Sequence, residues 1–424
     1  MRVPLAMLCG LLPWLAGCYL SYAELADEDA DASGRDADAP RDDGAPRDAD
    51  ADVPPDGPPC RVDEECDDDD PCTTDRCSVA GLCTHQPAPF EEPAEHTSIG
   101  WPHGGAAVGR EVWIVLGGYQ LQRWDLDGPL EEPRELFDPG GERDWDMAVA
   151  ATVSDVAVLT HVGGGLEWRL VGEPERVERT EPGGIFVDAA WTGRWLMAAG
   201  DWMDTCGLGW ADATGRWVAG VEAIPGGCVR GYVPSGPSAM TGHPPDMRPA
   251  GYTAAGEAVL LSIAGDGTIH ELTAGPEGWT VSEHRLSEPG PPYYHSLSAA
   301  RGPTGFGAQW VQVEDEEADG KLIRFAVLDE ADLQPLAAPL EEQVFGRTYV
   351  MQAAHLWCGG RHVGIWNDAH GSAVVQFTPD GRRLGETMRW GVDSDTARLR
   401  AVCLYGGVAV TTPSTITMLR CPAD

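Results

Sequence analysis

A short pattern recurs seven times along the chain and restricts what the chain can fold into. Each copy has an extended run, a pair of small residues, a short turn and an apolar segment. The pairs are Ala106-Ala107, Ala150-Ala151, Ala189-Ala190, Ala254-Ala255, Ala299-Ala300, Ala353-Ala354 and Ala401-Val402. Their spacing of 39 to 65 residues is typical of β-propeller blades and longer than helical or leucine-rich repeats. The pattern therefore predicts an all-β fold, a seven-bladed β-propeller over residues 94–424, with a six-bladed ring as the alternative.

Each copy contains the segments for a four-stranded antiparallel blade. In the first copy, Val112, Ile114 and Leu116 alternate along a strand that ends at a Gly117-Gly118 turn, as expected for a half-buried strand and a hairpin. Small pairs suit the crowded ring axis or the space between sheets. The tryptophans are expected to fill the wedges between adjacent sheets, because large aromatic side chains bury the most area; examples are Trp113, Trp195, Trp310 and Trp366.

The ends of the repeat array predict how the ring closes. The last copy, residues 397–421, has residues for three strands only. We expect the missing outer strand to come from the segment before the first copy, around Glu95 to Gly100. The longest interval contains a Pro- and Gly-rich insertion, Pro225 to Pro249, which predicts a long surface loop that could be functional or inert.

The first residues form an export signal. An apolar run from Val3 to Ala16 follows a single basic residue, Arg2, and is shorter than the ~20 residues needed to span a bilayer. Residues 15–18, Leu-Ala-Gly-Cys, resemble the lipobox of bacterial lipoproteins. The resemblance implies a signal peptide over residues 1–17, lipidation of Cys18 and a lipid anchor in the cell envelope. Tyr19 stands where the family's inner-membrane retention signal has Asp, which favours the outer membrane, on its periplasmic face or at the cell surface.

The composition of residues 18–59 predicts a disordered, acidic linker after the lipidated Cys18. After the cysteine they consist largely of Ala, Asp, Arg, Gly and Pro, a composition that buries too little apolar surface to fold. The whole chain has a formal net charge of −39 and no basic stripe. Nucleic acid is therefore excluded as a partner.

Residues 60–88 are rich in cysteine and aspartate. Five cysteines fall within 24 residues: Cys60, Cys66, Cys72, Cys77 and Cys83. The segment resembles the short Cys- and Asp-rich modules of secreted proteins from GC-rich Gram-negative bacteria. In an exported chain this pattern favours a disulfide-stapled module over a zinc site that would include His85. Asp67, Asp69 and Asp75 are weak calcium candidates, because the spacing does not fit an EF-hand loop.

The cysteine counts require a bridge between the two parts of the chain. Five more cysteines follow the module: Cys206, Cys228, Cys358, Cys403 and Cys421. Because both sets are odd, full pairing needs at least one bond from the module to the propeller. We hypothesise the pairs Cys206–Cys228 and Cys358–Cys403, with Cys421 bonded to the module, although sequence alone cannot fix connectivity.

Only one set of polar residues can be built from the repeats. If the strand with the small pair is innermost, the residues just upstream of it converge on the central channel: His103, Asp146, Asp188, His295 and Gln352. Such groups could bind a metal, a cation or a sugar, but solvated channel lining is the more common outcome. No H-E-x-x-H or G-x-S-x-G motif and no phosphate-binding loop is present.

These observations favour a non-enzymatic, lipid-anchored propeller that binds a protein, peptide or glycan of the envelope or the extracellular space. One alternative is a hydrolase or lyase at the channel mouth with His295 or His103 as base. Another is a calcium-dependent adhesion protein. No cofactor is predicted apart from that possible calcium.

Overall fold

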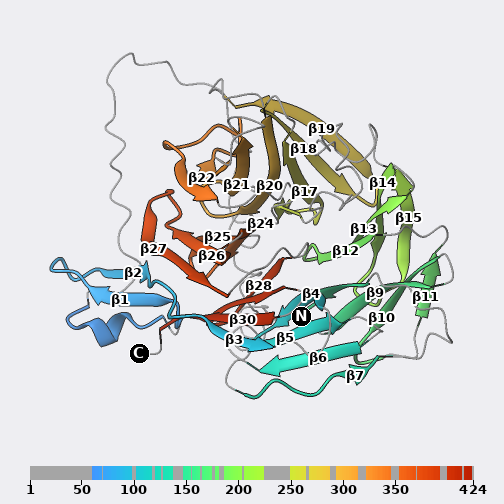
Figure 1. The fold of residues 1–424 in the computed structure, drawn as a ribbon, viewed down its shortest axis with the longest axis horizontal. Helices are drawn as coiled ribbons and strands as arrows, with labels where there is room; N and C mark the ends of the chain where they lie inside the picture. Colours follow the sequence, from blue (N-terminus) through green and yellow to red (C-terminus); the bar gives the residue numbers. More distant parts are fainter. Residues whose placement is uncertain are drawn as a thin grey trace, which may run out of the picture.

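The computed structural model describes residues 60–68, 70–97, 102–116, 120–125, 128–136, 147–153, 155–162, 165–173, 177–180, 186–202, 205–223, 249–263, 267–286, 293–313, 321–344, 353–368, 370–391, 399–412 and 415–422. These residues form seven four-stranded antiparallel sheets arranged around an axis (Figure 1). The predicted seven-bladed propeller is confirmed, so the six-bladed alternative is wrong. None of the described helices is long and apolar enough to cross a bilayer.

The blades follow one another along the chain. Blade 1 is β4 (Pro102–Val108), β5 (Glu111–Leu116), β6 (Gln120–Asp125) and β7 (Arg134–Glu135). Blade 2 is β8 (Met147–Ala151), β9 (Val156–Val162), β10 (Gly165–Leu170) and β11 (Val177–Thr180). Blade 3 is β12 (Phe186–Trp191), β13 (Leu196–Trp202), β14 (Thr205–Ala211) and β15 (Trp217–Ala223). Blade 4 is β16 (Gly251–Tyr252), β17 (Ala258–Ile263), β18 (Thr268–Gly275) and β19 (Gly278–Arg285).

The second half of the ring repeats this order. Blade 5 is β20 (Tyr293–Arg301), β21 (Phe306–Val313), β22 (Lys321–Leu328) and β23 (Leu340–Val344). Blade 6 is β24 (Ala353–Cys358), β25 (Arg361–Asp368), β26 (Gly371–Phe377) and β27 (Arg383–Trp390). Blade 7 is β28 (Arg400–Leu404), β29 (Gly407–Thr411) and β30 (Thr415–Arg420), completed by β3 (Ala94–Thr97).

The β3 strand closes the ring as predicted. It pairs antiparallel with β30, with Ala94 opposite Met418 and Thr97 opposite Thr415. The outer strand of the last blade therefore comes from the segment that precedes the first blade. This arrangement ties the two ends of the propeller together and covers the outer edge of β30.

The core lies between the blades. The described apolar side chains form seven clusters, one at each seam between neighbouring sheets. Trp310 and Trp366 are fully buried in two of these seams, and Trp113 and Trp195 pack against two others while remaining partly exposed. These positions confirm the predicted wedging by tryptophan. Large side chains fill the space that opens where the flat sides of neighbouring sheets diverge.

One of the seven small pairs was assigned incorrectly. Ala254-Ala255 is exposed in the turn after β16, which the Thr253 backbone N–H closes by donating to the Glu257 carbonyl. The equivalent positions are Ala250-Gly251, four residues earlier. Ala250 is buried, and a Cβ on Gly251 would lie 2.9 Å from the Cβ of Arg301. Close packing against the neighbouring blade, rather than the presence of alanine, therefore defines the position of the small pair. The other pairs lie on the first strands, most of which contact one another around the axis.

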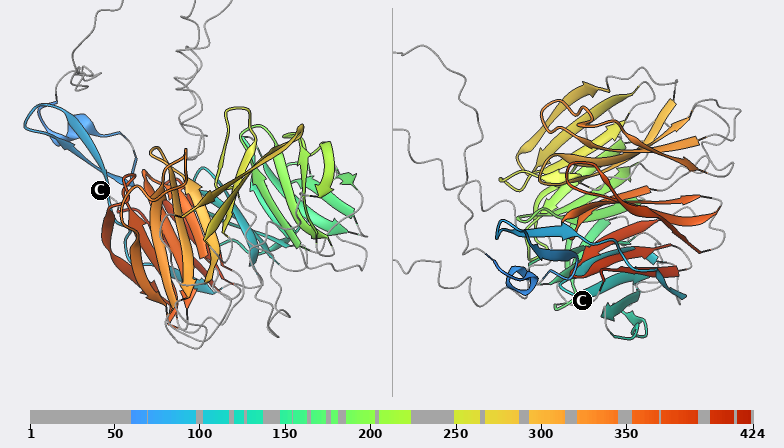
Figure 2. Two further views of the ribbon diagram at one scale, coloured as in Figure 1. Left: turned by 90° about the horizontal axis from the view of Figure 1, so that it is seen from above. Right: turned by 90° about the vertical axis from the view of Figure 1, so that its left-hand side faces the viewer.

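The Cys-rich segment forms a small separate sheet. It contains the 3-10 helix η3 (Asp63–Cys66) and the hairpin of β1 (Thr73–Cys77) and β2 (Cys83–Pro87). Figure 2 shows that this hairpin projects from the periphery of the ring, beside the last blades. The predicted loop at Pro225 to Pro249 lies almost entirely outside the described residues, as do the signal peptide and the linker.

Candidate functional site

Disulfides staple the module internally and bond it to the ring. Three bonds involve it: Cys60–Cys77, Cys66–Cys83 and Cys72–Cys421. A fourth, Cys358–Cys403, joins the first strands of blades 6 and 7. All five module cysteines are oxidised, so none is available as a thiolate ligand for zinc. Disulfides persist in oxidising compartments, which makes this an extracytoplasmic protein. The Cys206–Cys228 pair falls outside the described side chains.

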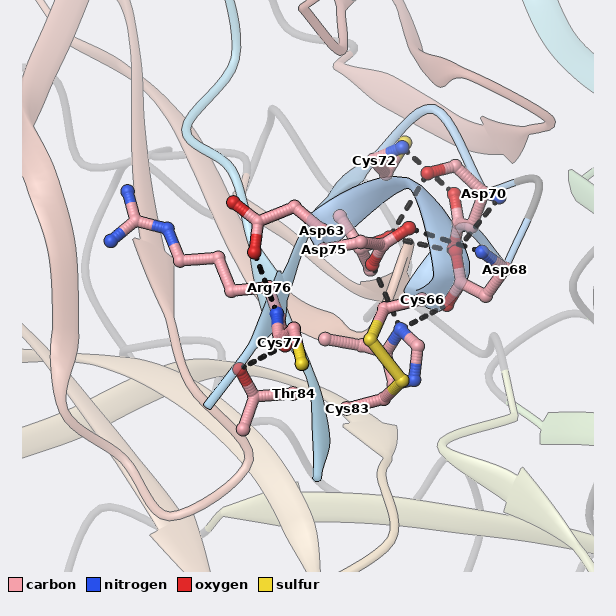
Figure 3. Close-up of polar contacts among 12 residues, drawn as sticks. Asp63, Cys66, Asp68, Asp70, Cys72, Asp75, Arg76, Cys77, Cys83 and Thr84 are labelled. Atoms are coloured by element: carbon pink, nitrogen blue, oxygen red, sulfur yellow. Dashed lines mark hydrogen bonds and ion pairs between the residues drawn. A yellow bond between two sulfur atoms is a disulfide. The ribbon is translucent and has the colours of Figure 1, made fainter. Parts of the chain in front are cut away.

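The module's carboxylates hold its turns. Asp63 Oδ1 accepts a hydrogen bond from the Cys77 backbone N–H at 2.7 Å, and Asp70 Oδ1 accepts one from Cys72 N–H at 2.8 Å (Figure 3). Burial raises the pKa of Asp70, while the hydrogen bond from Cys72 opposes that rise. In a segment with so little apolar surface, these bonds replace a core in fixing the loop.

Asp68, Asp75 and His85 converge on one point of the module. His85 Nδ1 lies 2.8 Å from Asp75 Oδ1 and 3.3 Å from Asp68 Oδ2. Burial acts to raise the pKa of Asp75, but hydrogen bonds from His85 and the Asp68 N–H hold it below its usual range. Their potential ligand atoms lie within 4.8 Å of one another. An imidazole with two carboxylates suits zinc better than calcium, which prefers oxygen ligands alone.

The calcium candidates are only partly gathered there. Asp75 belongs to the cluster together with Asp68, whereas Asp67 is not one of its members and Asp69 lies outside the described residues. Asp68 Oδ1 also accepts hydrogen bonds from Thr73 Oγ1 at 2.9 Å and Asp70 N–H at 3.0 Å. The cluster therefore already works as a turn-stabilising network.

A buried arginine joins the module to blade 6. Arg361 is fully buried at the start of β25, and its guanidinium donates to the carbonyl oxygens of Cys72 and Ala88. It also donates to Gln376 Oε1 and to the Gly359 carbonyl, both at 3.1 Å. Burial lowers the pKa of Arg361 to about 10, with the charge of Asp70 opposing the shift. The side chain is therefore still charged at neutral pH, and hydrogen bonds satisfy it.

Apolar contacts complete this junction. Phe90 lies under the guanidinium of Arg361, with 4.9 Å from the guanidinium carbon to the ring centre. Phe90, Cys72 and Cys421 belong to the same apolar cluster as the seam between blades 6 and 7. Gly359, at a φ of +55°, lets the module approach, because a Cβ there would lie 2.6 Å from the Cβ of Cys72. The module and the ring therefore share one core.

In the channel, the described side chains show one ion pair. Asp188 on β12 accepts a hydrogen bond from Arg400 on β28 at 3.3 Å, and both are largely buried. These strands are the first strands of blades 3 and 7, so the pair reaches across the ring. The side chains of His103 and His295, and the whole of Asp146 and Gln352, lie outside what the structure describes. Their predicted convergence stays a prediction.

Sequence reasoning missed Arg361 and a buried histidine pair, His355 and His362. Arg361 begins an apolar strand directly after Gly359-Gly360, and a charged residue at an inward position is a weak signal of a buried partner. The partner could not be inferred, because its carbonyl groups come from a segment 273 to 289 residues away.

Comparisons with known proteins give similarity at low identity. No protein family model matches this chain, and no curated protein matches its sequence. The crystal structure of BamB from Moraxella catarrhalis has a TM-score of 0.45 at 11% identity, covering 78% of this chain and 98% of that one. BBS1N in complex with ARL6DN has a TM-score of 0.47 at 10% identity, covering 80% and 98%. Kluyveromyces lactis Hsv2 has a TM-score of 0.43 at 9% identity, covering 77% and 90%. These values assign no function to this chain.

Proposed function

We propose that this chain is a lipid-anchored propeller of the cell envelope that binds a protein partner through its Cys-rich module. The module, residues 60–88, is stapled by disulfides and held rigidly on blades 6 and 7, so a partner would meet a preformed surface. Preformed surfaces bind with a smaller loss of conformational entropy. The acidic linker and the lipid on Cys18 would hold this surface at a distance from the membrane.

The observation that supports this proposal is the exposure of apolar side chains on the module. Seven large apolar side chains are strongly exposed in the described part of the chain, and Val62, Val79 and Leu82 of the module are three of them. Val79, in the β1–β2 turn, is as exposed as a free side chain. A segment this small and rigid gains nothing in its own stability from such exposure, and exposed apolar groups are typical of recognition surfaces.

A crosslinking experiment on intact cells tests the partner. Val79→Asp with Leu82→Asp should abolish a specific crosslinked product, because the charges would have to be desolvated on binding. Val281→Asp is the matched control, since Val281 on β19 is likewise an exposed apolar residue and its replacement should leave that product unchanged. Equal crosslinking by both variants would refute the module as the binding surface.

The anchor has its own test. Cys18→Ala should move the protein from the membrane fraction to the soluble envelope fraction, whereas retention on membranes would refute lipidation. The alternatives make separate predictions. A calcium-dependent adhesion protein should melt at a higher temperature with calcium than with a chelator, and an unchanged melt would exclude that alternative. An enzyme at the channel mouth should lose turnover on His295→Gln or His103→Gln.

A further inference from the structure

Two histidines face each other inside the seam between blades 5 and 6. His355 lies on β24 and His362 on β25, and their exposed fractions are 5% and 0%. His355 Nε2 and His362 Nδ1 are 3.4 Å apart. One imidazole must therefore donate and the other accept, so at least the accepting ring is neutral.

The described residues around the pair offer no counter-charge. Blade 5 contributes backbone, since a Cβ on Gly307 would lie 2.0 Å from His362 Nδ1 and 2.5 Å from His355 Nε2. Blade 6 contributes rings: Phe377 stacks on His355 at 6.4 Å and Trp357 meets His362 edge-on at 4.7 Å.

The remaining polar groups near the pair are few. From β20, Ser298 Oγ accepts the backbone N–H of His355 at 2.9 Å. The outer ring nitrogens, His355 Nδ1 and His362 Nε2, have no hydrogen-bond partner in the described structure. Among the described residues, the only titratable group that acts on His355 is His362, and no charged group acts on His362.

Burial therefore keeps both rings neutral. It lowers the pKa of His355 well below its ordinary value, with further lowering by His362, and it lowers the pKa of His362 to about 3. A proton on either ring would be a charge in an apolar seam, and a second proton would repel the first.

The same hairpin holds the module. Successive side chains of a strand point to opposite faces. Trp366, on the face of His362, packs with Phe325 of blade 5. Val363, on the face of Arg361, packs in the seam with blade 7 and the module residue Cys72. One strand thus joins the histidine pair to the Arg361 junction.

We propose that the His355–His362 pair is an acid-sensitive latch: protonation opens the seam between blades 5 and 6 and loosens the β24–β25 hairpin that holds the module. The Cys72–Cys421 bond keeps the loosened module attached. The pKa of His362 in the folded protein lies below its unfolded value of 6.5. The closed seam is therefore fully stable above pH 6.5 and loses stability as the pH falls toward 3. At pH 4.5 the loss from His362 alone is about 100-fold in the equilibrium constant for closing the seam.

Hydrogen exchange on the unmodified full chain tests the location. Between pH 7.5 and 4.5, after correction for intrinsic exchange rates, residues 353–368 and 72–90 should lose protection together. Residues 196–211 of blade 3 should keep theirs. A uniform loss over all blades, or no loss at residues 353–368, would overturn the proposal.

Variants test the cause. His362→Gln should remove about 100-fold of the acid-induced loss in the equilibrium constant for closing the seam, measured from the protection of residues 353–368, because an amide does not titrate in this range. His270→Gln is the control: His270 on β18 lies partly exposed beside Glu283, and its replacement should leave the acid loss unchanged. If His362→Gln retains the full acid loss while folded at pH 7.5, the latch is refuted.

Discussion

The two disulfides of the last blades offer a direct test of how the ring is held closed. Cys72–Cys421 joins residues 349 positions apart and Cys358–Cys403 joins residues 45 apart. If a disulfide acts by restricting the unfolded chain, the stabilisation grows with the logarithm of that separation. The relation gives about 6 kcal/mol for the long loop and about 4 kcal/mol for the short one. Removing the first bond should therefore cost about 2 kcal/mol more than removing the second.

The double variants Cys72→Ala/Cys421→Ala and Cys358→Ala/Cys403→Ala are well matched. Three of the four cysteines are buried and Cys403 is partly buried against the same apolar cluster, which keeps the cavity contribution similar. Urea unfolding followed by tryptophan fluorescence and by circular dichroism gives the free energies, provided that the two signals coincide.

The result that refutes this reasoning is equally definite. The clasp strand β3 already ties the first and last blades through its pairing with β30. If that pairing survives in the unfolded ensemble, the long loop is already closed and the two variants should lose similar free energy. Equal losses, or a larger loss for Cys358–Cys403, would show that loop length does not govern the stabilisation.

Three further predictions follow from the contacts. Arg361→Met should cost about 3–5 kcal/mol, because it leaves buried carbonyl groups without donors, and should speed tryptic cleavage within the module. Gly307→Ala should lower the melting temperature sharply because its Cβ would overlap both buried imidazoles, whereas Gly104→Ala, whose Cβ would meet only Val149 at 3.8 Å, should have little effect; equal shifts would contradict the packing. In a double-mutant cycle on urea unfolding, Asp188→Asn and Arg400→Gln should show a coupling of about 0.5–2 kcal/mol, and additivity would show that the channel ion pair contributes nothing.

The ring itself could be predicted because each blade must bury the same kind of surface. A repeat of small residues marks positions where neighbouring strands approach, and the missing fourth strand of the last copy required a donor. The fourth repeat shows the limit of this reasoning. Ala254-Ala255 fits the pattern in sequence, yet Ala250-Gly251 occupies the packed position, since a glycine meets the same steric demand as alanine.

The side-chain clusters could not be predicted to the residue. In the acidic run, a shift of one position separates Asp68, which reaches His85, from Asp67, which is not in the cluster. Loop conformation decides that shift, and no periodicity reports it. Arg361 and His362 were missed for another reason. The alternation of a strand assigns residues to two faces, but it does not say which neighbour covers each face.

The module and the propeller depend on each other for stability. A hairpin of two five-residue strands cannot bury enough surface to fold alone, and Cys72 and Phe90 lie in a core that blades 6 and 7 supply. Conversely, the ring without the module would lose the Cys72 and Ala88 carbonyls that Arg361 bonds and the packing of Cys72 in the blade 6–blade 7 seam. A partner that binds the module therefore contacts a surface whose position is set by β25. Opening of the seam between blades 5 and 6 should then weaken that binding. Affinity for the partner is expected to fall in acid together with the hydrogen-exchange protection of residues 353–368. A constant affinity while this protection is lost would show that partner binding and the seam are not coupled.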